Sequence, residues 1–179
     1  MLQNTKLDDD WIETRSGRIF WLPDVRLESI DITDIAHALS MTCRYSGHCN
    51  RFYSVARHSV EVAKTVPDYL KLAALLHDAS EAYLTDIPSP FKDMLHGYRE
   101  FEDMIQRVVY TRFEIDVDCN DPTIKEADTL ALRREAPRLG FTWANPIPND
   151  EGYVLPPSNP EDDKAAFMAA FYLYGGTNQ

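Results

Sequence analysis

The sequence contains few cysteines and glycines and has no excess of positive charge. Its three cysteines are an odd number without a CxxC pair, which argues against a disulfide framework and is typical of a reducing compartment. Seven glycines and eleven prolines among 179 residues exclude collagen-like and low-complexity classes. A glycine-rich phosphate loop is missing, so ATP-dependent phosphotransfer has no support. The formal net charge of -11 provides no broad basic surface, and we therefore expect neither nucleic acid nor a membrane as a partner.

Long apolar runs are also missing from the chain. The longest uninterrupted run spans the ten residues 165–174, whereas a membrane-spanning helix needs about 20. The polar, acidic N-terminus lacks the apolar region of a secretion signal. The sequence therefore predicts a cytoplasmic protein.

The composition that remains is that of a globular domain, since 44% of the residues are hydrophobic and 26% are charged. This length suits one domain, and we expect a single domain over residues 1–179. Apart from residues 18–22, which we expect to form a short strand or an extended arm, helical periodicity dominates, so the fold class expected is all-α. The expected helices are one capped at Thr33 or Asp34, one over 54–65, one from Asp68 to the stop at Pro88 and Pro90, one over 91–113, one opened by Asp121-Pro122, and one opened by Asn159-Pro160 that ends at Gly175.

The clearest amphipathic pattern lies between residues 91 and 113, where apolar side chains recur at steps of three and four. We interpret its part from Phe101 to Phe113 as core or as a dimer face. The C-terminal helix adds an aromatic surface that a small all-α core does not cover completely. We therefore expect a homo-oligomer, either a dimer or a higher assembly.

A group of polar residues lies in the most apolar part of the chain. His77 and Asp78 follow the run Leu70–Leu76, where a polar pair is costly to bury unless something compensates it. Glu81 lies four residues after His77, and four residues are close to one helical turn. On a continuous helix these three side chains would project within one arc, which packing alone does not explain.

Two more residues complete a candidate set of metal ligands. His58 lies in an apolar helical segment, and Asp128 lies in another, flanked by Ile124, Ala127 and Ala131. Together with His77 and Asp78 they supply two imidazoles and two carboxylates from three helices. Such a nitrogen and oxygen site suits a divalent cation, namely Mn, Co, Fe, Zn or Mg.

The order His58, His77-Asp78, Asp128 resembles the signature of the HD-domain metal-dependent phosphohydrolases. The similarity extends through residues 77–81, 86–92 and 125–128, and covers about residues 32–132. Within that superfamily these stretches are similar to the YfbR-type 5′-deoxynucleotidases and to the phage deoxynucleoside triphosphate hydrolases of the DatZ type. The resemblance implies an HD-type helical bundle in which His58, His77, Asp78 and Asp128 bind the metal.

The resemblance also implies roles for two acidic residues. Glu81 would hold or deprotonate the attacking water, and Asp86 would assist proton transfer near the leaving group. Substrate phosphates need cations in an acidic protein, and Arg44 and Lys92 are the best candidates. Tyr45 occupies the place of a bulky aromatic residue that follows the corresponding arginine in the deoxynucleotidases, so we expect it to contact the base or the sugar.

Two reactions and one non-catalytic function are compatible with this sequence. The spacing of Glu81 and Asp86 resembles that of the YfbR-type 5′-deoxynucleotidases, and this resemblance implies hydrolysis of a deoxynucleoside 5′-monophosphate to nucleoside and phosphate. A deoxynucleoside triphosphate triphosphohydrolase, which releases triphosphate, would place the attacked phosphorus beside the same metal. A non-catalytic module that binds metal or nucleotide is the third hypothesis, although it needs no spare carboxylate such as Glu81.

Overall fold

The computed structural model describes residues 10–22, 24–144, 147–148, 150 and 152–178. Residues 1–9 of the expected domain lie outside this part. The described chain is all-α, as the sequence predicts, with one small antiparallel hairpin of β1 (Trp11–Glu13) and β2 (Ile19–Trp21). The short strand expected as one alternative over 18–22 is confirmed as β2. No helix in the described ranges has the length and apolar character needed to cross a membrane.

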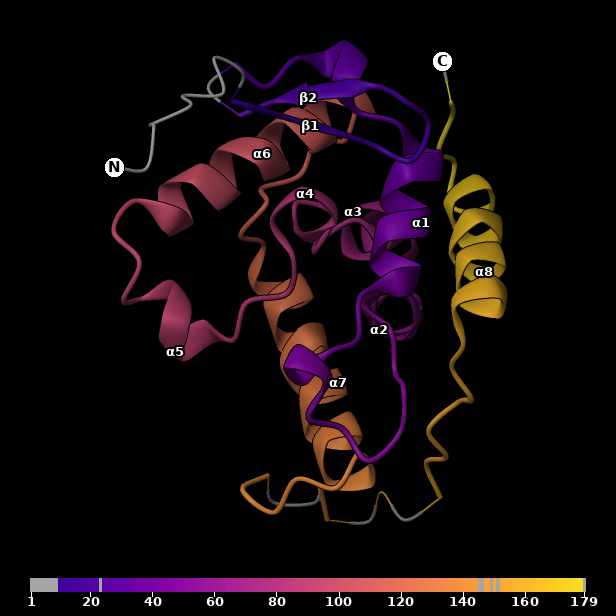
Figure 1. The fold of residues 1–179 in the computed structure, drawn as a ribbon. Helices are drawn as coiled ribbons and strands as arrows, with labels where there is room; N and C mark the ends of the chain where they lie inside the picture. Colours follow the sequence, from indigo (N-terminus) through magenta and orange to yellow (C-terminus); the bar gives the residue numbers. More distant parts are fainter. Residues whose placement is uncertain (1–9, 23, 145–146, 149, 151, 179) are drawn as a thin grey trace, which may run out of the picture.

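The helices follow the hairpin in chain order. They are α1 (Ile32–Met41), α2 (Val55–Ala63), α3 (Lys71–Leu75), α4 (Glu81–Leu84), α5 (Ser89–Lys92), α6 (Tyr98–Arg112), α7 (Pro122–Arg138) and α8 (Pro160–Leu173), with short 3₁₀ turns at Leu27–Ser29, Tyr45–Gly47 and Asp68–Leu70. Figure 1 shows α7 running from the centre of the molecule toward its lower end, and α8 along the right-hand side.

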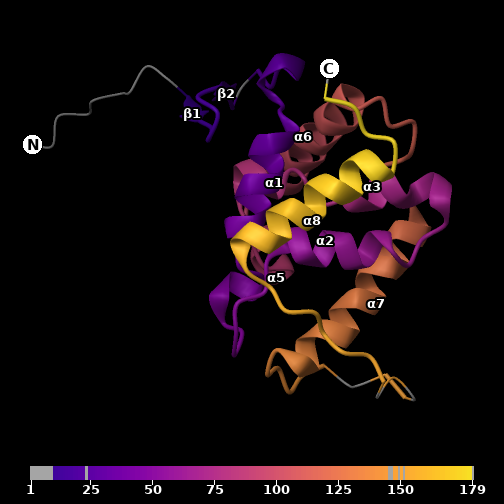
Figure 2. The same cartoon turned by 90° about the vertical axis from the view of Figure 1, so that its right-hand side faces the viewer.

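The second helix, α2, lies at the centre of the packing. It contacts α1, α3, α7 and α8, and Figure 2 shows α8 lying across α1 and α2. Seven of the nine residues of α2 are buried, including His58. The large side chains that fill the core around it come from β2, α1, α3, α6, α8 and the residues next to these elements: Phe20, Ile30, Ile32, Ile35, Leu39, Leu70, Leu75, Leu76, Ile105, Phe167 and Phe171.

Local sequence signals place the starts of α2, α7 and α8 correctly. Asp121 caps α7 by accepting a hydrogen bond from the Thr123 backbone amide at 2.8 Å, and Asn159 caps α8 in the same way. The cap of α1, however, is Asp31 and not Thr33 or Asp34. Asp31 has the extended backbone of a capping residue, whereas Asp34 accepts hydrogen bonds from Thr14 and Ser16 and so joins the hairpin to α1.

The prediction of a single helix from Asp68 to Pro88 and Pro90 is wrong. The first turn is 3₁₀, α3 ends at Leu75, and residues 76–80 form a turn before α4. His77 places its Nδ1 atom 2.8 Å from the Ala74 carbonyl oxygen, which a continuous helix would pair with the next turn. Gln106 of α6 donates to the Leu76 carbonyl and accepts from the Ser80 amide. Side chains therefore satisfy the backbone groups that this break releases.

The helix expected over 91–113 is also interrupted. Gly97 has a left-handed backbone with φ of 78°, which separates α5 from α6. In the stripe from Phe101 to Phe113, the residues Ile105, Val109 and Phe113 are buried, whereas the apolar residues between 91 and Gly97 are exposed. There, Phe91 is 59% exposed and Met94 is 80% exposed.

Candidate metal centre

The four predicted ligand residues converge at one point. His58 comes from α2, His77 and Asp78 from the turn after α3, and Asp128 from α7. The Nε2 atom of His58 lies 3.0 Å from Asp128 Oδ1 and 3.7 Å from Asp78 Oδ2. The Nε2 atom of His77 lies 3.1 Å from Asp78 Oδ2 and 3.9 Å from Asp128 Oδ1. A turn replaces the continuous helix expected after Leu75. This turn brings His77 and Asp78 close to His58 and Asp128.

The donor atoms have the spacing that a metal ion requires. One ligand atom each from His58, His77 and Asp128 lies within 4.8 Å of the others, so these three residues could hold a metal ion. Nitrogen and oxygen ligands lie about 2.0–2.2 Å from such an ion, which puts neighbouring donors roughly 3–3.5 Å apart. The separations between imidazole nitrogens and carboxylate oxygens, 3.0–3.9 Å, are close to this range.

The two imidazoles present unused donor atoms toward the same point. The Nε2 atoms of His58 and His77 are both buried, and neither makes a hydrogen bond. A buried polar atom without a partner is unfavourable by about 1–3 kcal/mol. Because carboxylate oxygens lie beside both nitrogens, a cation between them would satisfy nitrogens and oxygens together. The residues present therefore fit a divalent metal ion.

The surrounding charges favour a cation at this position. Burial and the charge of Arg44 lower the pKa of His58, but the carboxylates of Glu135 and Asp128 outweigh them and raise it to about 10. The pKa of Asp78 is held well below its ordinary value against the effect of burial, mainly because His77 lies beside it. The carboxylates that stabilise positive imidazoles would stabilise a bound metal in the same way.

Glu135 is a site residue that sequence reasoning missed. It is fully buried on α7, with Oε1 2.9 Å from His58 Nδ1 and Oε2 3.2 Å from Arg44 Nε. The signal that could have revealed it is its spacing from Asp128, because seven residues are nearly two helical turns. A glutamate on the ligand-bearing face of an amphipathic helix needs a buried partner, and His58 is that partner.

Arg44 and Tyr45, the predicted phosphate and base contacts, lie together at the edge of the centre. Arg44 is buried, and its Nη1 atom is 3.8 Å from Asp78 Oδ2. The Tyr45 ring packs against the guanidinium on one side and against Phe141 at 4.7 Å between ring centroids. Arg44 therefore reaches the metal ligands, and the roles of both residues toward a substrate stay predictions.

Glu81 and Lys92, both predicted site residues, contact each other. Glu81 is buried at the start of α4, with Oε1 3.3 Å from Lys92 Nζ and Oε2 without a hydrogen-bond partner. Lys92 also donates to Glu102 of α6 at 2.6 Å. Burial raises the pKa of Glu81 well above its ordinary value, and the carboxylates of Asp78 and Asp86 add to the rise. Glu81 thus has a free oxygen and the environment of a proton acceptor.

Asp86 connects the centre to a surface hollow. It lines a space of about 540 Å³ between the segment 41–47 and the segment 85–88. Burial raises the pKa of Asp86, while the charge of Arg44 opposes the rise and that of Asp78 adds to it. The hollow therefore opens beside residues that interact electrostatically with the metal ligands.

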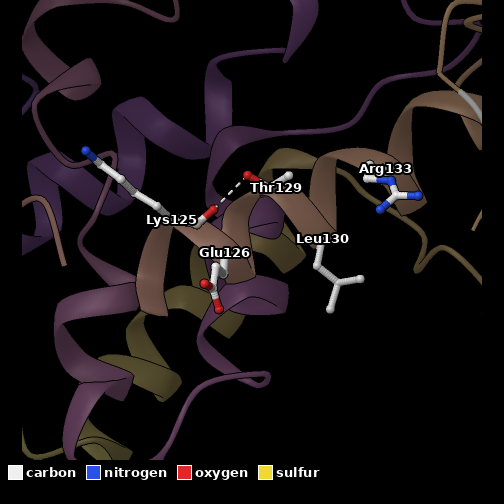
Figure 3. A pocket seen from close by; sticks show the side chains of 5 residues that line it. All are labelled: Lys125, Glu126, Thr129, Leu130 and Arg133. Atoms are coloured by element: carbon white, nitrogen blue, oxygen red, sulfur yellow. Dashed lines mark hydrogen bonds between the residues drawn. The ribbon is translucent and has the colours of Figure 1, made fainter. Parts of the chain in front are cut away.

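A second hollow, of about 270 Å³, lies on α7 away from this centre. Figure 3 shows the five side chains that line it: Lys125, Glu126, Thr129, Leu130 and Arg133. These positions form the helix face opposite Asp128 and Glu135, since residues three and four apart share a face. None of the predicted site residues lines it, and it is separate from the candidate metal centre.

Comparison with known proteins identifies relatives but no activity. No family model matches the chain. The chain is 36% identical over 167 residues to the uncharacterized protein YfdR of Escherichia coli (strain K12), covering 90% of the chain and 93% of that protein. It is also 36% identical over 148 residues to the uncharacterized protein RCAP_rcc00048 of Rhodobacter capsulatus, covering 75% of the chain and 76% of that protein.

Proposed function

The chain belongs to the same family as the uncharacterized protein YfdR of Escherichia coli, and we propose that it is a divalent-metal-dependent phosphohydrolase that acts on nucleotides. The observation that carries the proposal is the pair of buried imidazole nitrogens, His58 Nε2 and His77 Nε2, which face carboxylate oxygens without a hydrogen bond. The ordered residues of the HD signature support the same reading, with Asp78 and Asp128 completing the ligand set.

The residues around the centre have complementary roles in this proposal. A divalent metal there supplies Lewis-acid chemistry, because it makes water more acidic and neutralises charge on a phosphoryl group. Glu81, with one free and buried carboxylate oxygen, orients the attacking water and accepts its proton. Asp86, half-buried beside the surface hollow, returns a proton to the leaving oxygen.

The positive charges near the centre favour a monophosphate as the substrate. Arg44 and Lys92 are the cations assigned to substrate phosphate, yet Arg44 is paired with Glu135 and Lys92 with Glu81 and Glu102. A triphosphate would need more positive charge than these paired side chains offer. The hollow beside Asp86 provides space for the nucleoside half. We therefore propose a deoxynucleoside 5′-monophosphate as the substrate.

The experiment that tests this function is a substrate screen on metal-loaded protein. Chelator-treated protein is reloaded with Mn²⁺, Co²⁺ or Mg²⁺ and offered deoxynucleoside monophosphates and triphosphates. We expect inorganic phosphate from the monophosphates, and no turnover by Asp128→Asn. Glu126→Gln, on the exposed side of the same helix, serves as the matched control and retains full activity.

Other outcomes of the screen would contradict the proposal in different ways. Release of triphosphate from a deoxynucleoside triphosphate would identify a triphosphohydrolase. Metal binding without turnover of any nucleotide would identify a non-catalytic module. The expected self-association is tested separately, by sedimentation of the same preparation.

A further inference from the structure

The buried carboxylate of Glu135 contacts two different parts of the centre. One oxygen lies 2.9 Å from Nδ1 of His58, and the other lies 3.2 Å from Nε of Arg44. Glu135 is fully buried, and so are His58 and, nearly so, Arg44. One side chain thus connects a candidate metal ligand with a candidate phosphate-binding residue.

The contact with His58 determines which ring nitrogen is available. A carboxylate that accepts a hydrogen bond from Nδ1 keeps the proton on that nitrogen and leaves the Nε2 lone pair free. In this structure Nε2 is the atom that points toward Asp128 and Asp78. Glu135 therefore holds the His58 ring in the tautomer and orientation that a metal ligand needs.

The contact with Arg44 determines where its terminal nitrogens point. With Nε directed toward Glu135, the guanidinium presents Nη1 toward Asp78 at 3.8 Å. A buried arginine without a counter-ion would be strongly unfavourable, and Glu135 is its nearer carboxylate partner, at 3.2 Å against 3.8 Å for Asp78. A phosphoryl group beside Asp78 would meet this guanidinium already in place.

We propose that Glu135 is a positioning residue that orients His58 for metal and Arg44 for the substrate phosphate at the same time. This inference rests on the proposed function of the centre. It assigns Glu135 no contact with the substrate. Its effect on the reaction passes through the two residues that it holds.

A second buried carboxylate that contacts the central helix α2 provides a matched control. Asp163 of α8 is also fully buried and binds Arg57, the residue before His58, with 2.7 Å between Asp163 Oδ1 and Arg57 Nε. It also accepts a hydrogen bond from Ser54, the cap of α2, at 2.6 Å. Asp163 therefore anchors α2 through an arginine without contacting His58, so its removal perturbs the helix and leaves the proposed positioning contact intact.

The test compares Glu135→Ala, Glu135→Gln and Asp163→Asn in the full chain. Mn²⁺ affinity is measured by calorimetric titration of folded protein, and thermal unfolding is measured on the same samples. We expect Glu135→Ala to weaken Mn²⁺ binding about 10–100-fold, the usual loss for a residue that orients a metal ligand. Glu135→Gln keeps an acceptor for His58 but loses the charge opposite Arg44, so we expect a smaller loss of affinity together with a raised KM. Asp163→Asn lowers the unfolding temperature and leaves Mn²⁺ affinity within about twofold.

The possible failures are distinguishable from one another. If both Glu135 variants unfold earlier but bind Mn²⁺ like the wild type, with an unchanged KM, Glu135 is only structural and the inference is overturned. If Glu135→Ala does not fold, an unchanged Mn²⁺ affinity and KM in Glu135→Gln overturn it equally. If the wild-type protein itself binds no metal, the proposed function fails, and with it the premise of this inference.

Discussion

The candidate metal centre and the α5 segment, residues 89–97, differ in which side chains they bury and which they expose. In the metal centre, charged residues such as His58 and Glu135 are fully buried and held by one another. In the α5 segment, the large apolar residues Phe91 and Met94 are exposed, and α5 stands apart from the main helices in Figure 1. Burial of charge is unfavourable unless it is compensated, so its concentration at one point indicates function there. The contrast predicts large chemical effects from the centre and small effects from the segment.

The largest expected effect comes from Asp78→Ala. Asp78 supplies an oxygen beside both imidazoles, so its removal abolishes metal uptake and lowers activity to about a thousandth or less, since the metal contributes several kcal/mol. Metal content and turnover are measured on the same sample. Asp93→Ala removes an exposed carboxylate from the α5 segment, where it pairs with Arg99, and leaves both values unchanged. Equal losses of metal content and turnover in Asp78→Ala and Asp93→Ala would contradict the proposed difference between the two regions.

The next effect separates metal binding from proton transfer. Glu81→Gln keeps the size of the side chain but cannot accept a proton, so we expect kcat to fall about 10²–10⁴-fold while metal affinity is retained. Glu102→Gln is the matched control, because Glu102 also binds Lys92 but has no place in the proposed chemistry. Full activity in Glu81→Gln would remove the role assigned to this residue.

A smaller effect is expected where the two regions meet. Lys92 belongs to the α5 segment but binds Glu81 at the centre. Lys92→Met removes a cation available to substrate phosphate, and we expect KM to rise about tenfold, as for the loss of one charged hydrogen bond. Lys64→Met, at an exposed ion pair with Glu61, leaves KM unchanged. The steady-state kinetics of both variants check this, and an unchanged KM in Lys92→Met would contradict a phosphate role.

The smallest effect concerns stability and not chemistry. Met94→Ala changes the free energy of unfolding by no more than about 0.5 kcal/mol, because the side chain is exposed. Ile105→Ala, in the fully buried part of α6, costs about 2–5 kcal/mol. Urea unfolding of both variants measures the difference. A large loss in Met94→Ala would mean that a partner covers the α5 segment in solution.

The starts of α7 and α8 were predictable because their signals are local. The caps Asp121 and Asn159, each followed by proline, fix helix starts through contacts within three residues. The break after Leu75 depends instead on Gln106, which comes from a helix some thirty residues later and satisfies backbone groups of the turn. Such a tertiary contact is not readable from helical periodicity. The break at Gly97 did have a local signal, because glycine adopts a left-handed backbone easily.

The convergence of His58, His77, Asp78 and Asp128 was predictable from their order in the sequence, whereas the contacts that support them were not. His58, His77, Asp78 and Asp128 are unusual side chains in apolar surroundings, and the sequence alone marks them. Glu135 is one of three acidic residues of α7, with Glu126 and Asp128, and only the packing of α7 on α2 selects it as the partner of His58 Nδ1. Residue types in a sequence indicate which side chains could bind a metal. Which residue orients such a side chain is seen only from contacts in three dimensions.

The central claim is that side chains from α2, α7 and the turn after α3 hold one cation, and anomalous diffraction from a crystal grown with Mn²⁺ tests it directly. The account predicts a single anomalous peak per chain, within coordination distance of His58 Nε2, His77 Nε2 and a carboxylate oxygen each of Asp78 and Asp128. A well-ordered centre without a peak, or a peak only at other carboxylates such as Glu126 on the far side of α7, would contradict it.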